Sequence, residues 1–195
     1  MSDGIAELPP VWLLDVDGVI NAISERGDCA TWPADQWRRH EVTHLNGTTW
    51  PILAAEPVLD FLREVHHAGA AELRWHTTWQ NSAQHRLAPA LGLPDWPVAG
   101  SPEFTDQHDS GYGFAAQVRR TWWKLGAVER VIREEGRRLL WTDDDIRYGG
   151  DEELERVLSA PGVLAVSPTP TTGLDRGDLA SIADFLNLGR HPTTT

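Results

Sequence analysis

The chain has 195 residues, a formal net charge of −12 and a single cysteine, Cys29. The acidic surplus argues against nucleic acid as a partner, because phosphate backbones require clustered Lys and Arg side chains, and one cysteine excludes an internal disulfide framework. No signal peptide is recognisable, and no stretch approaches the roughly 20 apolar residues of a membrane span. We therefore expect one cytoplasmic domain over residues 1–195 that does not bind membranes, with loose tails at 1–9 and 190–195.

The first predicted strand, at about 11–16, is an apolar run that leads into two aspartates, Asp15 and Asp17. Such a run suits a strand buried on both faces, and Gly18 allows the chain to turn sharply. The carboxylates then lie at the carboxyl end of the strand, where open α/β sheets place ligands, and Mg²⁺ is their natural cation. A plain Asp-x-Asp-Gly turn is the alternative. An EF-hand calcium loop is excluded because its later ligand positions do not match.

Residues 18–55 are predicted to form a flap or small cap over the end of that strand. Within them, 37–43 and 48–53 can pair as a hairpin across an Asn-Gly turn. The string from His40 to His44 matches the H-E-x-x-H pattern of zinc proteases, whose chemistry requires a helix. Because this string contains β-branched residues and the Asn-Gly turn follows at once, we predict a strand here and no zinc site.

A helix at about 57–68 and a β-capable run at 70–79 follow, and the run ends near Thr77 and Thr78. A further helix is predicted at about 80–91. A hydroxyl between a strand end and a helix start is well placed to donate to an anion, together with the helix N–H groups. The alternative is an ordinary helix N-cap, which threonine also serves.

The next predicted elements are a short strand at 96–100, a polar loop at 101–113 and a helix at about 114–135, which contains Lys124. A lysine in a helix usually has its charged end in water. This one is directly preceded by two tryptophans and followed by leucine, which is less ordinary. Lys124 is therefore retained as a candidate site residue.

A second buried strand, at about 137–142, runs into three consecutive aspartates, of which Asp143 and Asp144 are the favoured site residues. One acidic strand end is typical of a turn, but two in a single α/β domain indicate a metal site shared between neighbouring strands. The remaining elements complete the predicted domain: a helix at 151–158, a strand at 162–166, and a final helix from Asp175 to Gly189.

The order of these motifs resembles the haloacid dehalogenase (HAD) superfamily, whose members are mostly Mg²⁺-dependent phosphatases. The motifs, in chain order, are Asp15-Val16-Asp17-Gly18-Val19, Thr77 or Thr78, Lys124, and Asp143-Asp144. The chain departs from the family where Leu125 follows the lysine in place of the common proline. The Thr-Thr-Trp string, the acidic triplet and Thr172-Gly173-Leu174 also resemble the HAD domains of Swiss Army Knife RNA repair proteins.

The resemblance implies an α/β fold of the HAD type: a Rossmann-like three-layer sandwich with a mainly parallel central sheet of about five strands and the flap after the first strand. It also implies that Asp15 attacks phosphorus to form an aspartyl-phosphate. Asp17 would protonate the leaving oxygen and then deprotonate the attacking water. Mg²⁺ would bind Asp15, the backbone carbonyl of Asp17, Asp143 and Asp144.

In the same family pattern, Thr77 and Lys124 would bind the phosphoryl oxygens, where negative charge accumulates in the transition state. Lys124 would also keep Asp15 ionised. Thr78 and Gly18 are assigned to substrate binding beside them. The adjacent threonines leave open which of the two serves the motif, and we favour Thr77 because it ends the apolar stretch.

The expected substrate is a phosphorylated small molecule rather than nucleic acid. A nucleic-acid end phosphatase of an RNA or DNA repair type is an alternative, because Arg38, Arg39, Arg119 and Arg120 could form a local basic patch. A second alternative is a non-catalytic binding module that retains the metal site as a scaffold. The oligomeric state is not predicted.

Overall fold

The computed structural model describes residues 8–100, 123–148 and 152–189 of the chain. These residues form an α/β fold around a four-stranded sheet with strand order β4-β1-β5-β6, in which every neighbouring pair is parallel. The strands of this sheet are β1 (Val11–Leu14), β4 (Glu72–Trp75), β5 (Leu139–Thr142) and β6 (Val163–Val166). The predicted α/β class with a parallel sheet is confirmed.

The register of the sheet aligns the carboxyl ends of its strands. Leu14 of β1 pairs with Trp75 of β4 on one side and with Thr142 of β5 on the other. Thr142 pairs in turn with Val166 of β6. The residues that follow all these strands therefore meet at one edge of the sheet, among them the aspartates that follow β1 and β5.

The strand predicted at 96–100 is absent, which corrects the expectation of about five strands. An isolated parallel bridge joins Val98 to Trp75, and the Trp75 backbone N–H donates to the carbonyl of Pro97 at 2.8 Å. Pro94 and Pro97 have no N–H group with which to extend a ladder. Among the described residues the parallel sheet thus has four strands.

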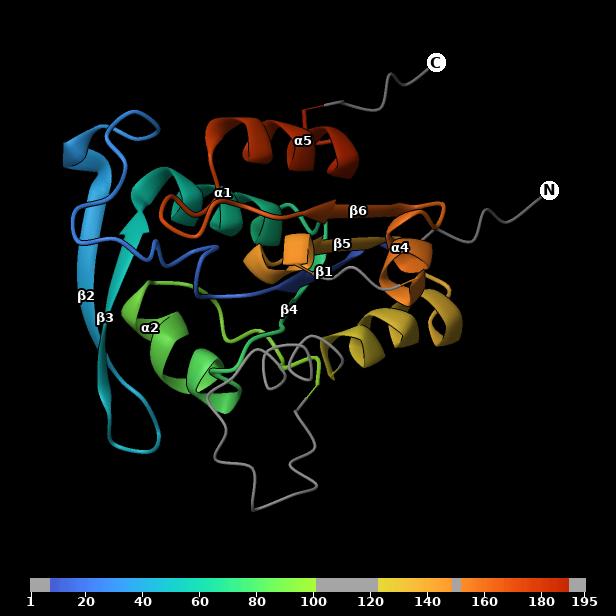
Figure 1. Ribbon diagram of the computed structural model, residues 1–195, viewed down its shortest axis with the longest axis horizontal. Helices are drawn as coiled ribbons and strands as arrows, with labels where there is room; N and C mark the ends of the chain where they lie inside the picture. The colour runs from blue at the N-terminus through green and yellow to red at the C-terminus, as the bar shows by residue number, and fades with distance from the viewer. Residues whose placement is uncertain (1–7, 101–122, 149–151, 190–195) are drawn as a thin grey trace.

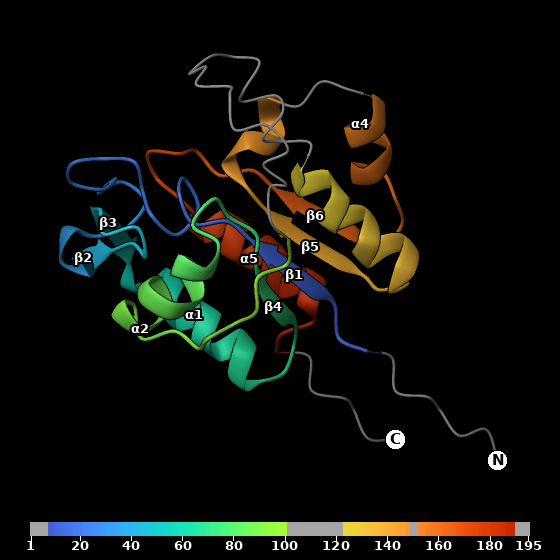
Figure 2. The same ribbon diagram turned by 90° about the horizontal axis from the view of Figure 1, so that it is seen from below.

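Helices cover both faces of this sheet (Figures 1 and 2). One face carries α1 (Glu56–His67) and α5 (Arg176–Leu186). The other carries α4 (Glu152–Leu158) and a helix that runs over 123–129 and continues as the π-helical turn η3 (Arg130–Glu134). Within the described parts of the chain, no helix is long and apolar enough to cross a membrane.

The side chains of β1 alternate between these two helical layers. Trp12 and Leu14 belong to the core cluster that contains the apolar residues of α1 and α5. Val11 and Leu13 belong to the second cluster, on the face of α4. All four side chains are fully buried. Burial on both faces explains why β1 is a continuous apolar run and not an alternating one.

The predicted hairpin after the first strand is confirmed. After the short 3-10 turn η1 (Ala34–Gln36), β2 (Trp37–Thr43) and β3 (Thr49–Ala55) pair antiparallel, and Gly47 in the connecting turn has a φ of +89°. Figure 1 shows this hairpin beyond the carboxyl ends of the sheet strands. The first four residues of the H-E-x-x-H string, His40 to Thr43, lie on β2 as predicted, and His44 directly follows the strand.

The helix predicted at 80–91 is irregular. The π-helical turn η2 (Ala83–Leu87) is followed by the short helix α2 (Ala88–Ala90), and Gly92, with a φ of +63°, follows the end. Pro89 lacks the N–H that a regular α-helix would direct to the carbonyl four residues earlier, and this local loss accounts for the wider turn.

Helix α5 begins as predicted and ends earlier than predicted. The Asp175 carboxylate accepts from the Asp178 backbone N–H at 2.8 Å, and the Asp178 carboxylate accepts from the Asp175 N–H at 3.0 Å. At the other end Asn187, with a φ of 56°, forms a left-handed cap before the predicted helix end at Gly189. Asparagine tolerates this conformation better than most residues, which explains the shift.

Several predictions concern residues outside the described ranges, namely the loop and helix start at 101–122 and most of both tails. Pro9 was expected in a loose tail. Its carbonyl accepts a hydrogen bond from Arg137 Nε at 3.0 Å, so it belongs to the folded domain.

Replacing Asp175 by alanine removes the N-cap of α5. We expect Asp175→Ala to lower the free energy of unfolding by about 1 kcal/mol, measured by urea denaturation. Asp184→Ala changes an exposed aspartate of the same helix and should stay within about 0.5 kcal/mol of the wild type. Equal losses in the two variants would contradict the capping role of Asp175.

Candidate active site

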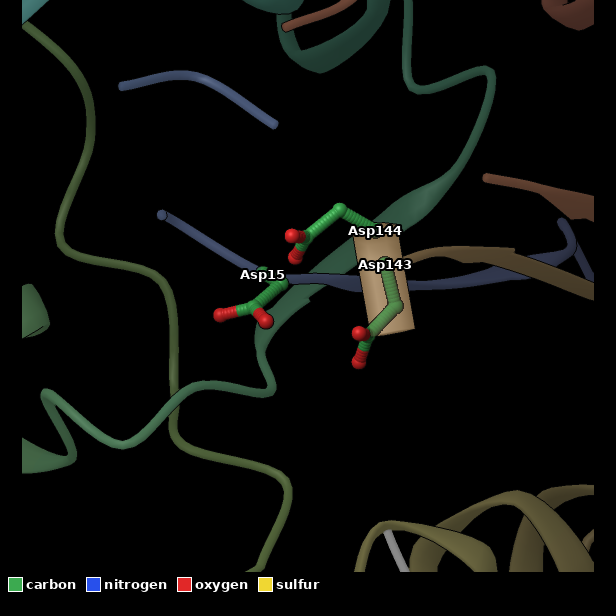
Figure 3. A group of neighbouring side chains, drawn as sticks. All are labelled: Asp15, Asp143 and Asp144. Atoms are coloured by element: carbon green, nitrogen blue, oxygen red, sulfur yellow. The ribbon is translucent and has the colours of Figure 1, made fainter. Parts of the chain in front are cut away.

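Three carboxylates meet at the carboxyl edge of the sheet (Figure 3). Asp15 follows β1, Asp143 follows β5, and Asp144 begins the 3-10 turn η4 (Asp144–Tyr148). Each contributes a carboxylate oxygen, and these oxygens all lie within 4.8 Å of one another. Because carboxylate oxygens are the ligands of hard cations, this group could hold a metal ion.

Backbone hydrogen bonds fix the positions of two of these aspartates. The Asp15 N–H donates to the carbonyl of Thr142 at 3.1 Å, and Asp15 Oδ1 accepts from the N–H of Val16 at 2.7 Å. Asp143 Oδ1 accepts from the N–H of Asp145 at 3.0 Å. The remaining oxygen of each carboxylate is then free of the backbone and available to a cation.

The ammonium group of Lys124 is a cation that contacts these carboxylate oxygens. It lies 2.5 Å from Asp15 Oδ2 and 2.6 Å from Asp143 Oδ2. All three side chains are buried, and Lys124 is only 4% exposed. The expectation that this lysine is not an ordinary solvated residue is therefore confirmed.

The charges of this group shift its pKa values. Burial opposes the charged form of Lys124, but the charges of Asp15 and Asp143 outweigh burial and raise the lysine pKa. Burial raises the pKa of Asp143 to about 7, and the neighbouring charge of Asp15 adds to the effect. Burial, followed by the charges of Asp145 and Asp15, also raises the pKa of Asp144 to about 7. Three carboxylates face one ammonium, and a divalent cation would relieve this excess of negative charge.

Asp17 is held apart from the acidic group by two side-chain donors. Asn21 Nδ2 donates to Asp17 Oδ1 at 2.7 Å, and Trp79 Nε1 donates to Asp17 Oδ2 at 2.9 Å. Burial raises the pKa of Asp17 although both hydrogen bonds oppose the shift. The Asp17 carboxylate is not among the three that could hold a metal, and a metal bond from its backbone carbonyl stays a prediction.

The two candidate threonines differ in exposure. Thr77 is fully buried, and its hydroxyl oxygen accepts from the N–H of Trp79 at 3.3 Å, whereas Thr78 is exposed. The N–H of His76 donates to the carbonyl of Leu14 at 2.8 Å, so Thr77 follows β4 next to the end of β1. Phosphoryl binding by Thr77 and substrate binding by Thr78 stay predictions.

Gly18 is required at its position for a reason that the sequence did not reveal. Its φ is +73°, and a Cβ atom added there would lie 2.4 Å from Asp144 Cγ and 2.5 Å from Asp144 Oδ2. Glycine therefore permits the Asp144 carboxylate to lie against the turn that follows β1. The predicted role of Gly18 in substrate binding is untested, and its observed contact is with a candidate metal ligand.

Sequence reasoning left the partners of Asp17 unassigned. Asn21 lies four residues after Asp17 and Trp79 lies in the segment after β4, and no sequence pattern marks either side chain as a donor to Asp17. Two other tryptophans near the site are core residues whose indole N–H groups donate to backbone carbonyls: Trp32 Nε1 to that of Leu174, and Trp37 Nε1 to that of Trp32.

Comparisons of the chain with models of known families, with curated proteins and with solved structures found no match.

The contact between Gly18 and Asp144 can be tested with a matched pair of glycines. Gly18→Ala and Gly47→Ala both place a Cβ at positive φ, but nothing lies within 4 Å of the Cβ at Gly47. We expect both variants to lose about 1 kcal/mol of stability from backbone strain. If Asp144 binds Mg²⁺, Gly18→Ala alone should weaken Mg²⁺ binding, measured by calorimetry, by roughly tenfold or more, because the added Cβ displaces the Asp144 carboxylate. Unchanged affinity in Gly18→Ala would refute the proposed role of Asp144.

Proposed function

We propose that the chain is a Mg²⁺-dependent phosphatase of the HAD type, which hydrolyses phosphate monoesters through an aspartyl-phosphate on Asp15. The observation that carries this proposal is the buried ammonium of Lys124 between Asp15 and Asp143 at the carboxyl edge of a parallel sheet. A lysine at this place can pair with the nucleophile and bind a phosphoryl oxygen at the same time.

The first half of the reaction transfers the phosphoryl group to the protein. An Asp15 carboxylate oxygen attacks phosphorus, and the bond from phosphorus to the leaving oxygen breaks. Asp17 gives its proton to that oxygen. The raised pKa of Asp17, caused mainly by burial, favours the protonated form that this step requires. Lys124 and Thr77 bind the phosphoryl oxygens throughout.

The second half of the reaction hydrolyses the aspartyl-phosphate and regenerates the free Asp15 carboxylate. Asp17, now ionised, takes a proton from water as the water oxygen attacks phosphorus. The bond between phosphorus and Asp15 then breaks, and inorganic phosphate leaves. Asp143, Asp144, Asp15 and the backbone carbonyl of Asp17 would hold Mg²⁺, whose chemistry is to offset the repulsion between the carboxylate nucleophile and the phosphate anion.

A nucleic-acid end phosphatase finds less support. The Arg39 side chain donates to the carbonyl of Glu25, and that of Arg38 donates to the carbonyls of Asp35 and Trp37. Both guanidinium groups are thus already bound to the protein backbone. Arg119 and Arg120 lie outside the described ranges. A phosphorylated small molecule remains the favoured substrate.

Hydrolysis of p-nitrophenyl phosphate, with Mg²⁺ or with EDTA, tests this function. We expect Mg²⁺-dependent turnover in the wild type and a fall of about 10³-fold or more in Asp15→Asn, because the amide oxygen is not a competent nucleophile. Asp145→Asn is the control, since Asp145 is outside the acidic group and should retain most of the activity. Normal turnover in a folded Asp15→Asn protein would disprove the assignment.

The role of Asp17 predicts a dependence on the leaving group. An alkyl alcohol needs a proton in order to leave, whereas p-nitrophenolate leaves without one. Asp17→Asn should therefore reduce kcat for glycerol phosphate more than kcat for p-nitrophenyl phosphate, by roughly tenfold or more. Equal losses on both substrates would contradict the role of Asp17 as the acid that protonates the leaving oxygen.

A further inference from the structure

A cavity of about 300 Å³ lies beside the candidate active site, between the turn after β1, the hairpin and the segment after β4. This volume is at the lower end of the range of small-molecule sites, roughly 300–1,000 Å³, so it suits one compact organic group and not a polymer. The residues that line it come from these three segments: Asp17, Asn21, His44, Asn46, Trp50, Pro51, Thr78 and Trp79.

The position of Asp17 in the wall identifies which part of a substrate would enter. In the proposed reaction the phosphoryl group lies at Asp15 and Lys124, and Asp17 contacts the oxygen that leaves. Asp17 lines the cavity, whereas Asp15 and Lys124 do not. A leaving group bound to this oxygen is therefore directed into the cavity, and its chemistry must match the walls.

Two tryptophans give the cavity a surface suited to a flat ring. Trp50 lies on β3 of the hairpin and is 51% exposed, so a large apolar face is open to a ligand. Trp79 is buried, and its indole N–H donates to the Asp17 carboxylate. The centroid of its ring lies 5.5 Å from the centroid of the His44 ring. Stacking on aromatic side chains is a strong and sequence-tolerant means of holding a nucleobase.

Hydrogen-bond donors stand beside these rings. The side-chain oxygen of Asn46, Oδ1, accepts from the backbone N–H of Thr48 at 3.0 Å. The side-chain NH₂ group of Asn46 bonds to none of the described residues. His44 Nδ1 accepts from the N–H of Asn46 at 3.2 Å, so in the neutral ring the proton is on Nε2. The Asn46 amide and the His44 ring can thus donate to acceptor atoms on the edge of a heterocycle.

The charge of the cavity limits the substrate further. Among the described residues its lining contains no lysine or arginine, and Asp17 is the one acidic residue. A second phosphate in the cavity, or the backbone of a nucleic-acid strand, would meet no cationic side chain from the described part of the lining. The leaving group is therefore expected to be neutral.

We infer that the substrate is a nucleoside monophosphate, whose neutral nucleoside occupies this cavity with its base against Trp50. This inference rests on the proposed phosphatase function, because Asp17 orients the substrate only if it protonates the leaving group.

Calorimetry with adenosine and uridine 5′-monophosphates tests the inference on the Asp15→Asn protein in Mg²⁺, where no turnover obscures binding. Adding Trp50→Ala should weaken binding by roughly tenfold, the typical loss of one stacked base, and Trp50→Phe should restore most of it. Leu45→Ala removes a half-exposed apolar side chain of the same hairpin that does not line the cavity, and it should have no effect. Glycerol phosphate should bind more weakly than either nucleotide and be insensitive to Trp50.

Two results would overturn the inference. One is nucleotide binding that Trp50→Ala does not weaken, and the other is no preference for nucleotides over glycerol phosphate. If wild-type protein still hydrolyses p-nitrophenyl phosphate with Mg²⁺, the proposed function stands and only the substrate class is wrong. If it does not, while nucleotides bind through Trp50, the cavity is a nucleotide site and the phosphatase function is wrong.

Discussion

The candidate site depends on one buried cation, the ammonium of Lys124 between Asp15 and Asp143. A buried ion pair adds little net stability, because the cost of removing charges from water offsets most of their attraction. Stability alone therefore does not account for a lysine in this place. Three carboxylates around one ammonium leave negative charge uncompensated, and a divalent cation would balance it. In the proposed function the same ammonium would bind a phosphoryl oxygen, so a buried charge group that costs free energy in the absence of substrate would serve phosphoryl transfer.

The rest of the fold positions this group. Parallel pairing of β1 with β5 in matched register brings the residues after both strands to one edge, which unites aspartates that are far apart in the sequence. The turn after β1 contains Gly18, whose missing side chain leaves space for Asp144. The hairpin then returns over the same edge and contributes His44 and Trp50 to the cavity beside Asp17. Asp15 and Asp143 thus follow strands of the sheet, Lys124 lies on the helix over 123–129, and the hairpin contributes part of the cavity wall.

The sequence predicted those features that depend on local pattern. Apolar runs that end in aspartate located Asp15 and Asp143, and an Asn-Gly turn between β-branched residues located the hairpin. The bonds from Asn21 and Trp79 to Asp17 were missed because they depend on how the turn after β1 packs against the segment after β4, which no periodicity records. The prediction of a strand at 96–100 was wrong for a similar reason. Local propensity does not show that this segment pairs with β4 at only one isolated bridge.

The most direct test of the central claim is the thermal stability of the chain with Mg²⁺ and beryllium fluoride, which mimics a phosphoryl group on a carboxylate. Binding to the folded state raises Tm by mass action. We predict that Tm of the wild type rises further with both additives than with Mg²⁺ alone, and that this further rise is lost in Asp15→Asn. A further rise of the same size in Asp15→Asn, or none in the wild type, would contradict the assignment of Asp15 as the phosphoryl acceptor.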